Sequence, residues 1–251
     1  MAKVVTLGTA AVVRDRAHAH TYMALCGERG FYLIDCADSP VLRIREAGLA
    51  LEDLRGLIIT HFHPDHVLGV PILLIEASIL GRTDPLPIYG IQDVMDRYNT
   101  LMDLFRRDEW PGFFDTPCHV VSEGEGALVL DDDDFYITAT PVKHVVPNIG
   151  LRVKSKHGGG VAAYSSDTAP CDAVVKLAQD ADILIHEAAG STPGHSSVVQ
   201  AGEVARRAGA RRLVLVHYRP APHKYNLWIE EAAEVFDGPV ELAQDLAKYE
   251  F

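Results

Sequence analysis

The sequence predicts an α/β protein in which two β-sheets pack face to face and helices cover the outside, a four-layer αββα sandwich. Strand patterns come first, helical patterns follow, and this order then repeats along the chain. The chain has 251 residues, of which 48% are hydrophobic and 23% are charged. This is the composition of a globular protein. We expect residues 1–251 to form one domain, because no stretch rich in Gly, Ser or Pro marks a boundary.

The first half of the chain is expected to supply one sheet and its helices. Gly27 and Gly30 between two apolar runs predict a hairpin turn. Ser39 and Pro40 are typical of a helix start, and Gly48 is typical of a helix end. The expected strands are 4–7, 22–26, 31–34 and 57–60, and the expected helices are 40–47, 67–80 with a break near Pro71, and 91–107.

The second half is expected to supply the other sheet. Its strands are short apolar runs, and the acidic run 131–134 between two of them predicts a solvated turn. The expected strands are 120–121, 127–130, 135–140, 149–153, 161–164, 182–185, 213–216 and 240–243, and the expected helices are 172–179, 198–209 and 230–236.

A dense cluster of metal-ligand residues follows the strand 57–60. It reads His61-x-His63-x-Asp65-His66. Alternate residues of an extended segment point to the same side, so His61 and His63 can share one metal ion. Asp65 and His66 follow at a turn into a helix and can reach a second ion. Three imidazoles and a carboxylate within six residues suit zinc or a similar transition metal.

Three further strands end in the same way. His144 follows the strand 135–140, Asp167 follows 161–164, and His217 follows 213–216. A single His or Asp at a strand end is more often structural than a ligand. Together these three residues would complete two coordination shells that the first cluster leaves half filled.

These motifs resemble the metallo-β-lactamase superfamily, and within it the ribonuclease Z group and related phosphodiesterases. The His-x-His-x-Asp-His element is highly specific for the superfamily. The elements His186-Glu187-Ala188 and His195-Ser196-Ser197 resemble two elements of the ribonuclease Z group. The resemblance implies the αββα sandwich over nearly the whole chain, a metal-dependent hydrolase activity and a homodimer.

The resemblance also implies a role for each site residue. His61, His63 and His144 would hold the first metal ion, His66, His217 and Asp65 the second, and Asp167 would bridge the two. A hydroxide between the ions would be the nucleophile, and Asp65 would accept a proton from it. His195 would donate a proton to the leaving group, and Glu187 would orient His195. Two divalent ions are therefore expected as cofactors, with zinc first and manganese or iron as alternatives.

The chain departs from ribonuclease Z in the segment after His144. In the short form of that family a basic arm that holds transfer RNA is inserted there, but here only a short segment separates His144 from Asp167. The net charge is −12, and backbone binding to nucleic acid requires a basic face. Transfer RNA is therefore an unlikely partner. We expect a small, anionic substrate with a phosphodiester-type bond.

Other functions of the same fold remain open. A lactone, thioester or β-lactam hydrolase would use the same ions without requiring His195, although the expected cytoplasmic location disfavours a secreted β-lactamase. A sulfate-ester hydrolase of the same fold is a further alternative. A di-iron redox protein is disfavoured because relatives of that kind replace the second His of the motif with Glu, whereas this chain has His63. A metal-binding protein without catalysis is the non-enzymatic alternative.

Several residues outside the motifs also have more than one interpretation. His186 is expected to be a packed, hydrogen-bonded histidine, and His18 and His20 to be structural unless they border the pocket. Arg219 can meet an anionic substrate or form a surface ion pair. The aromatic loop at Trp110, Phe113 and Phe114 can pack in the core, roof the pocket or fill a dimer interface.

The expected environment of the chain is the cytoplasm. The four cysteines contain no Cys-x-x-Cys pair and are too few for a disulfide scaffold. The first residues predict a strand and a turn rather than a signal peptide, and no apolar run is long enough to span a membrane.

Overall fold

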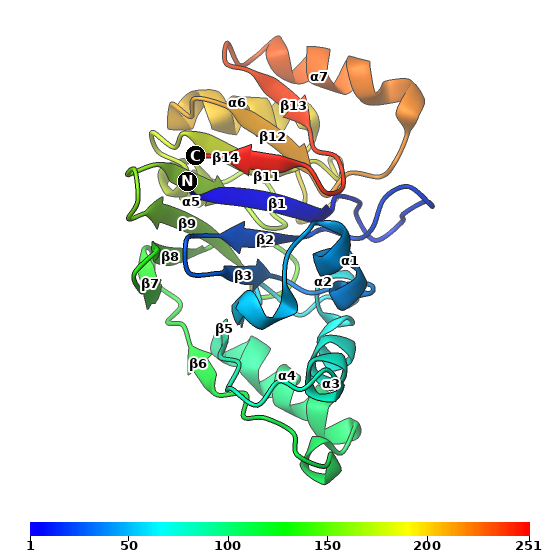
Figure 1. Ribbon diagram of the computed structural model, residues 1–251. Coiled ribbons are helices and arrows are strands. Elements are labelled where there is room, and N and C mark those ends of the chain that lie inside the picture. The colour runs from blue at the N-terminus through cyan, green and yellow to red at the C-terminus, as the bar shows by residue number, and fades with distance from the viewer.

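Two seven-stranded β-sheets pack face to face in the computed structural model, which describes residues 1–251. The larger apolar core lies between the sheets and under the helices of the first sheet, and a smaller core lies between the second sheet and its own helices. Figure 1 shows the helices on the outside of the two sheets. The predicted αββα sandwich is confirmed.

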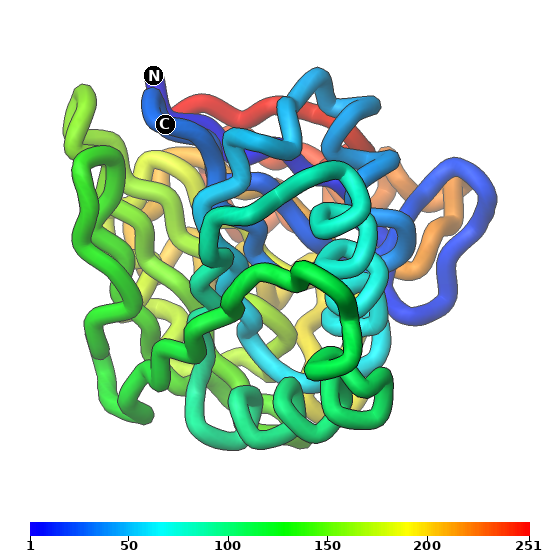
Figure 2. Tube along the Cα trace, turned by 60° about the horizontal axis from the view of Figure 1, so that its bottom comes forward, coloured from blue at the N-terminus to red at the C-terminus, as the bar shows by residue number.

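The first sheet has the strand order β14-β1-β2-β3-β4-β5-β6. Its pairs are antiparallel from β14 to β3 and parallel from β3 to β6. The first and last strands of the chain are neighbours, so the two termini lie side by side (Figures 1 and 2). Its strands are β1 (Lys3–Gly8), β2 (Tyr22–Cys26), β3 (Phe31–Ile34), β4 (Leu54–Ile58), β5 (Ile88–Gly90), β6 (Cys118–Val120) and β14 (Lys248–Glu250).

The second sheet has the order β13-β12-β11-β10-β9-β8-β7. Its pairs are antiparallel from β7 to β10 and parallel from β10 to β13. The four residues of β12 are all buried, as expected of a strand covered on both faces. Its strands are β7 (Ala127–Asp131), β8 (Phe135–Pro141), β9 (Ile149–Ser155), β10 (Val161–Tyr164), β11 (Ile183–Glu187), β12 (Leu213–Val216) and β13 (Val240–Leu242).

Seven α-helices cover the sheets. Helix α6 buries Val198, Val204 and small residues on one face, ends at Gly209 with φ of +65°, and begins with a complete capping box at Ser197. The helices are α1 (Pro40–Glu46), α2 (Pro64–Val67), α3 (Val70–Ile79), α4 (Gln92–Leu104), α5 (Asp172–Leu177), α6 (Val198–Ala208) and α7 (Tyr225–Ala233). None of these helices combines the length and the apolar character that crossing a membrane requires.

Two helix predictions were wrong in detail, and the predicted helix 91–107 ends three residues early, at Leu104. The break in 67–80 falls at Leu68–Gly69 rather than at Pro71, which lies in the first turn of α3 where its missing N–H costs nothing. A Cβ at Gly69 would lie 2.7 Å from the carbonyl oxygen of Ala37, so the chain bends where only glycine fits. Helix α7 starts five residues before the predicted helix 230–236. The prediction missed this start because Ala232 is the only buried residue of the helix, so the sequence shows only a weak apolar period.

The strand predictions fail mainly for the shortest strands. Strands β5 and β14 have three residues each and were not predicted, because so short a segment is defined by its partners. Strand β11 extends two residues beyond the predicted 182–185, since His186 and Glu187 pair with β12.

One edge of the sandwich collects the ends of the strands that carry the motifs. Strands β3 and β4 run parallel in the first sheet, and β10, β11 and β12 run parallel in the second. Strand β8 runs in the direction of β10, because each is antiparallel to β9. The carboxyl ends of all these strands therefore lie at corresponding edges of the two sheets, the usual place of a ligand site in such folds.

Candidate metal centre

Seven side chains converge at this edge. They divide into two groups, and within each group the ligand atoms lie within 4.8 Å of one another: His61, His63, His144 and Asp167 in one, and Asp65, His66 and His217 in the other. Asp167 and His217 form a further group of this kind with His195. The two groups are those that the resemblance implied for two metal ions. Each ligand follows a strand end or the turn after it, so the sheets fix the positions of the side chains.

The first group is centred on His63. The distance from His63 Nδ1 to His61 Nε2 is 3.2 Å, and the distance to His144 Nε2 is 3.1 Å. His144 donates its Nδ1 hydrogen to the carbonyl oxygen of Gly194 at 2.8 Å, which leaves Nε2 aimed at the cluster. His61 is fully buried and its Nδ1 lies 3.0 Å from Thr60 Oγ1.

The second group is centred on His217. Its Nε2 lies 3.4 Å from Asp65 Oδ2, 3.4 Å from Asp167 Oδ2 and 3.4 Å from His66 Nε2. Asp167 Oδ2 also lies 3.5 Å from His66 Nε2 and 3.8 Å from His61 Nε2. Asp167 thus contacts ligands of both groups, which is the position of a bridging carboxylate.

The residues present fit divalent metal ions. His61 Nε2 and His144 Nε2 both approach His63 Nδ1, and one N–H hydrogen on His63 cannot form hydrogen bonds with both. The buried Oδ1 of Asp167 has no hydrogen-bond partner at all. Buried polar atoms are normally paired, so this cluster has the character of a ligand shell. Five imidazoles and two carboxylates are donors that suit zinc, manganese or iron.

The protonation states of the first group's histidines and of Asp65 also favour metal binding. Burial lowers the pKa of His61 well below its usual value, and burial lowers the pKa values of His63 and His144 as well. Burial alone would raise the pKa of Asp65, but the hydrogen bond and charge of His217 lower it to about 2. The three imidazoles are therefore neutral and Asp65 is ionised at neutral pH, which are the forms that bind metals.

His195 and Glu187 lie beside the cluster. The Nδ1 hydrogen of His195 is donated to Glu187 Oε1 at 3.0 Å, and this bond raises the pKa of His195. The His195 ring stacks on the ring of His217 with 5.7 Å between centroids. Its Nε2 is free of protein partners and can donate a proton to a bound molecule.

Sequence reasoning missed one important contact of a ligand. Asp35 is fully buried at the end of β3 and accepts the Nδ1 hydrogen of His66 at 2.8 Å. Such a bond fixes which nitrogen of the imidazole faces the metal. The signal was available, because Asp35 follows a buried strand just as Asp167 and His217 do.

The other histidines lie outside the cluster. His186 is buried in β11 and donates its Nδ1 hydrogen to the carbonyl oxygen of Glu187 at 2.8 Å, as expected of a packed histidine. His18 bonds to Asp15 and His20 bonds to Asp38. Arg219 is exposed and forms no ion pair, so neither role weighed for it gains support.

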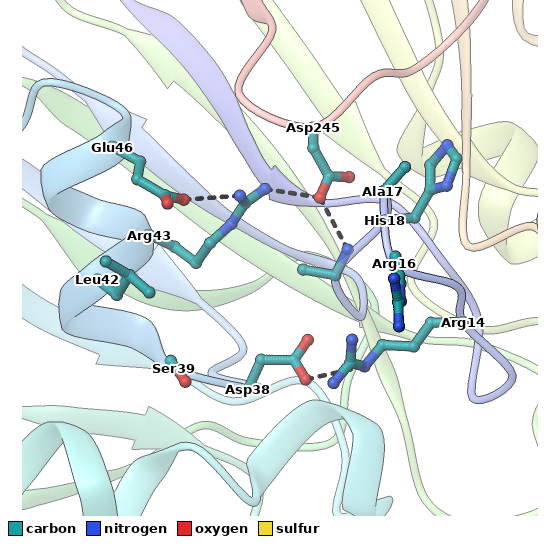
Figure 3. Close-up of a pocket in the computed structure, with 11 residues that line it drawn as sticks. Arg14, Arg16, Ala17, His18, Asp38, Ser39, Leu42, Arg43, Glu46 and Asp245 are labelled. Carbon is teal, nitrogen blue, oxygen red and sulfur yellow. Dashed lines mark hydrogen bonds and ion pairs between the residues drawn. The ribbon is translucent and has the colours of Figure 1, made fainter.

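A small pocket lies between the loop 14–19 and helix α1. Figure 3 shows Arg43 bound between Glu46 and Asp245, and Arg14 bound to Asp38. The pocket has a volume of about 220 Å³. These two guanidinium groups are paired, whereas Arg16, which also lines the pocket, forms no ion pair.

The segment between His144 and Asp167 contains only strands β9 and β10 and their short connections. No arm projects from this part of the chain. The aromatic loop packs against the main core through Phe114, which is buried, while Trp110 and Phe113 are partly buried. The loop therefore contributes to core packing.

Comparison with known proteins agrees with this geometry. Residues 32–218 match the description "Beta-lactamase superfamily domain". The chain is 30% identical to a protein named Ribonuclease Z from Methanothermobacter thermautotrophicus over 306 aligned positions, which cover 100% of this chain and 97% of that protein. Since this chain has only 251 residues, the relative carries segments that this chain lacks.

Two solved structures are also similar. One is the metallo-beta-lactamase fold protein YhfI from Bacillus subtilis, with a TM-score of 0.82, 23% identity and coverage of 100% of this chain and 99% of that one. The other is described as a new diphosphatase from the PhnP family, with a TM-score of 0.76, 20% identity and coverage of 100% and 98%. At these identities the two structures support the fold alone.

Proposed function

The chain belongs to the metallo-β-lactamase superfamily of metal-dependent hydrolases, and from this premise we propose that it cleaves a phosphodiester-type bond in a small substrate with two divalent ions. The observation that carries the proposal is the His195–Glu187 pair beside the seven ligands. Hydrolysis of a phosphodiester expels a poor leaving group, so a positioned proton donor accelerates it. A lactone or thioester hydrolase has no equal need of this pair.

The proposed ligands are His61, His63 and His144 for one ion, Asp65, His66 and His217 for the other, and Asp167 for both. Two such ions would lower the pKa of water and stabilise negative charge on attacking and leaving oxygens. We propose zinc first, because imidazole nitrogen is the most abundant donor. Manganese and iron also suit this set of ligands.

Asp65 and His195 are proposed to carry out the two proton transfers of the reaction. Asp65 is ionised and half-buried at the cluster, so its carboxylate can accept a proton from the attacking water. His195, held by Glu187, keeps a proton on Nε2 and donates it to the oxygen that leaves.

A small anionic substrate fits the chain better than transfer RNA. The net charge of −12 opposes long nucleic-acid backbones, and no arm follows His144. The four cysteines are unpaired, which supports a cytoplasmic location.

The test is a paired measurement on the wild type and His195→Ala. Elemental analysis should give two metal ions per chain in both proteins. Turnover of 2′,3′-cyclic AMP, whose leaving group is an unactivated ribose oxygen that needs a proton donor, should fall by about 100-fold or more in His195→Ala. His157→Ala removes an exposed histidine outside the cluster and should leave turnover unchanged.

Two results would contradict the proposal. A wild type that ignores the phosphodiester but hydrolyses a lactone, a thioester or a sulfate ester equally well in both variants would move the function to that alternative. A protein that binds two ions but hydrolyses none of these compounds would support a metal-binding role without catalysis.

We also propose a homodimer, formed through one face of α3. On α3, Ile72 and Ile79 are 46% and 77% exposed and, with half-buried Ile75, follow one another at helical spacing, and Leu68, 60% exposed, lies just before the helix. An exposed apolar stripe on a helix can pair with the same stripe of a second copy about a two-fold axis. Ile72→Asp should yield a monomer in analytical ultracentrifugation, whereas Leu227→Asp on α7 should leave the dimer intact. A monomeric wild type would contradict this.

A further inference from the structure

Ser166 has an unusual backbone conformation one residue before Asp167. Its φ is +52°, in the left-handed region that favours glycine, and the residue is fully buried. Asp35, which binds the proposed ligand His66, and the proposed ligand His217 have φ values of +60° and +52°. Residues held in this region cost free energy and tend to be kept where surrounding structure and function require them.

The side chain of Ser166 connects the two sheets. Its Oγ lies 3.0 Å from Thr60 Oγ1, at the end of β4, and 2.9 Å from Asn148 Oδ1, just before β9. The one hydroxyl proton of Ser166 therefore faces two acceptors, one from each sheet. These three side chains are all buried. Loss of the Ser166 hydroxyl would therefore leave buried polar groups without a hydrogen-bond partner, which costs free energy.

Each partner of Ser166 leads to a proposed metal ligand. Thr60 Oγ1 lies 3.0 Å from His61 Nδ1 and 3.0 Å from Asp35 Oδ2, and Asp35 in turn holds His66. On the other sheet, Asn148 Nδ2 donates to the carbonyl oxygen of Asp167 at 2.7 Å. An unbroken polar chain thus runs from His66 to Asp167 through Ser166.

We propose that Ser166 is a positioning residue that sets the spacing between the ligands of the first sheet and the ligands of the second. The inference rests on the metal centre proposed above. Glycine would adopt this φ without strain, but glycine has no hydroxyl to join Thr60 to Asn148. Metal ligands must be held within about half an ångström, and outer hydrogen bonds of this kind hold them.

Two substitutions separate the hydroxyl from the backbone strain. Ser166→Ala removes the hydroxyl and keeps the strain, whereas Ser166→Gly removes both. We expect both variants to bind Zn²⁺ about 10- to 100-fold more weakly in competition with a chromophoric chelator. With Co²⁺ in place of zinc, the visible absorption spectrum should change in both, because the ligand geometry changes.

The matched control is Ser155→Ala. Ser155 is 1% exposed at the far end of β9, and its hydroxyl bonds only within its own turn, to His157. This variant loses a buried hydroxyl as Ser166→Ala does, but it should keep the Zn²⁺ affinity and the Co²⁺ spectrum of the wild type. If Ser166→Ala does not fold, Ser166→Gly alone decides, since it relieves the strain.

Wild-type Zn²⁺ affinity and an unchanged Co²⁺ spectrum in Ser166→Gly would overturn the inference and leave the metal centre standing. A wild type that binds no metal would overturn the metal centre and the inference with it. The first failure is observed in the variant and the second in the wild type, so the two are distinguishable.

Discussion

Glu187 illustrates how much one buried residue organises. It has no exposure to water, yet it accepts four hydrogen bonds, from the backbone N–H groups of Thr168, Ala189 and Ser196 and from His195. Burial raises its pKa, while the bond from His195 opposes that rise. The carboxylate thus ties the loop after β10 to the loop that carries His195.

Glu187→Gln should damage both the fold and the proposed acid. The glutamine side chain carries an NH2 group that would face N–H groups which now donate to Glu187. We therefore expect the free energy of unfolding in urea to fall by about 1–3 kcal/mol. Turnover of the phosphodiester should fall by about 10- to 100-fold, because His195 loses its orientation. Glu125→Gln, at an exposed ion pair with Lys176, should change neither quantity. Equal turnover in Glu187→Gln and wild type would refute the orienting role.

The pair of His20 and Asp38 makes stability depend on pH. The bond to Asp38 raises the pKa of His20 above 6.5. Burial works to raise the pKa of Asp38, but the bonds from His20 lower it below 3.8. The contribution of His20 is complete below pH 6.5 and is lost as pH rises through its raised pKa, and that of Asp38 is lost as pH falls through its lowered pKa.

Asp38→Asn should therefore destabilise the protein more at about pH 5.5 than at about pH 8. Part of the effect persists at the higher pH, because Arg14 also pairs with Asp38 and stays charged. Urea unfolding of both proteins with a chelator present measures the difference. The same loss of stability at both pH values would show that the His20 charge contributes nothing.

At the scale of elements, helix α6 carries its own start signal. Ser197 Oγ accepts the N–H of Gln200 at 3.2 Å, and the Gln200 side chain accepts the N–H of Ser197 at 2.9 Å. This reciprocal cap lies two residues after His195, so the helix start also fixes the end of the loop that holds His195. The sequence alone predicted the helix to within one residue at its C-terminal end.

Ser197→Ala should lower the free energy of unfolding by about 1 kcal/mol, because the N–H of Gln200 loses its acceptor. Chemical unfolding followed by circular dichroism measures this change. Ser191→Ala, in the exposed loop before the helix, is the control and should be neutral within about 0.5 kcal/mol. A Ser197→Ala variant as stable as this control would mean that the cap contributes nothing.

At the scale of the whole molecule, the proposed metal ions would join the two sheets. His61, His63, Asp65 and His66 follow β4 of the first sheet, whereas His144, Asp167 and His217 follow strands of the second. Ions that bind the folded chain and not the unfolded one stabilise the folded state by mass action.

Removal of metal by a chelator should therefore lower the unfolding temperature. Zn²⁺ at 100 times its Kd should restore about 2.7 kcal/mol of stability per site. Thermal unfolding followed by circular dichroism, before and after Zn²⁺ is returned, tests this. An unfolding temperature indifferent to chelator and to Zn²⁺ would contradict the metal centre.

The sequence alone determined the sandwich, most of its strands and the seven residues that the structure brings together. These signals are local in the sequence. An apolar run predicts a strand, and a His or Asp directly after that run is recognisable as a possible metal ligand, as at His61, Asp167 and His217. Tertiary structure alone decided which residues hold those ligands and where the three-residue strands lie. Thr60 and Ser166 are 106 residues apart, and Asp35 and His66 are 31 apart. The hydrogen bond of a hydroxyl or carboxylate has no periodicity in sequence, so its partner is fixed only when the two sheets pack together.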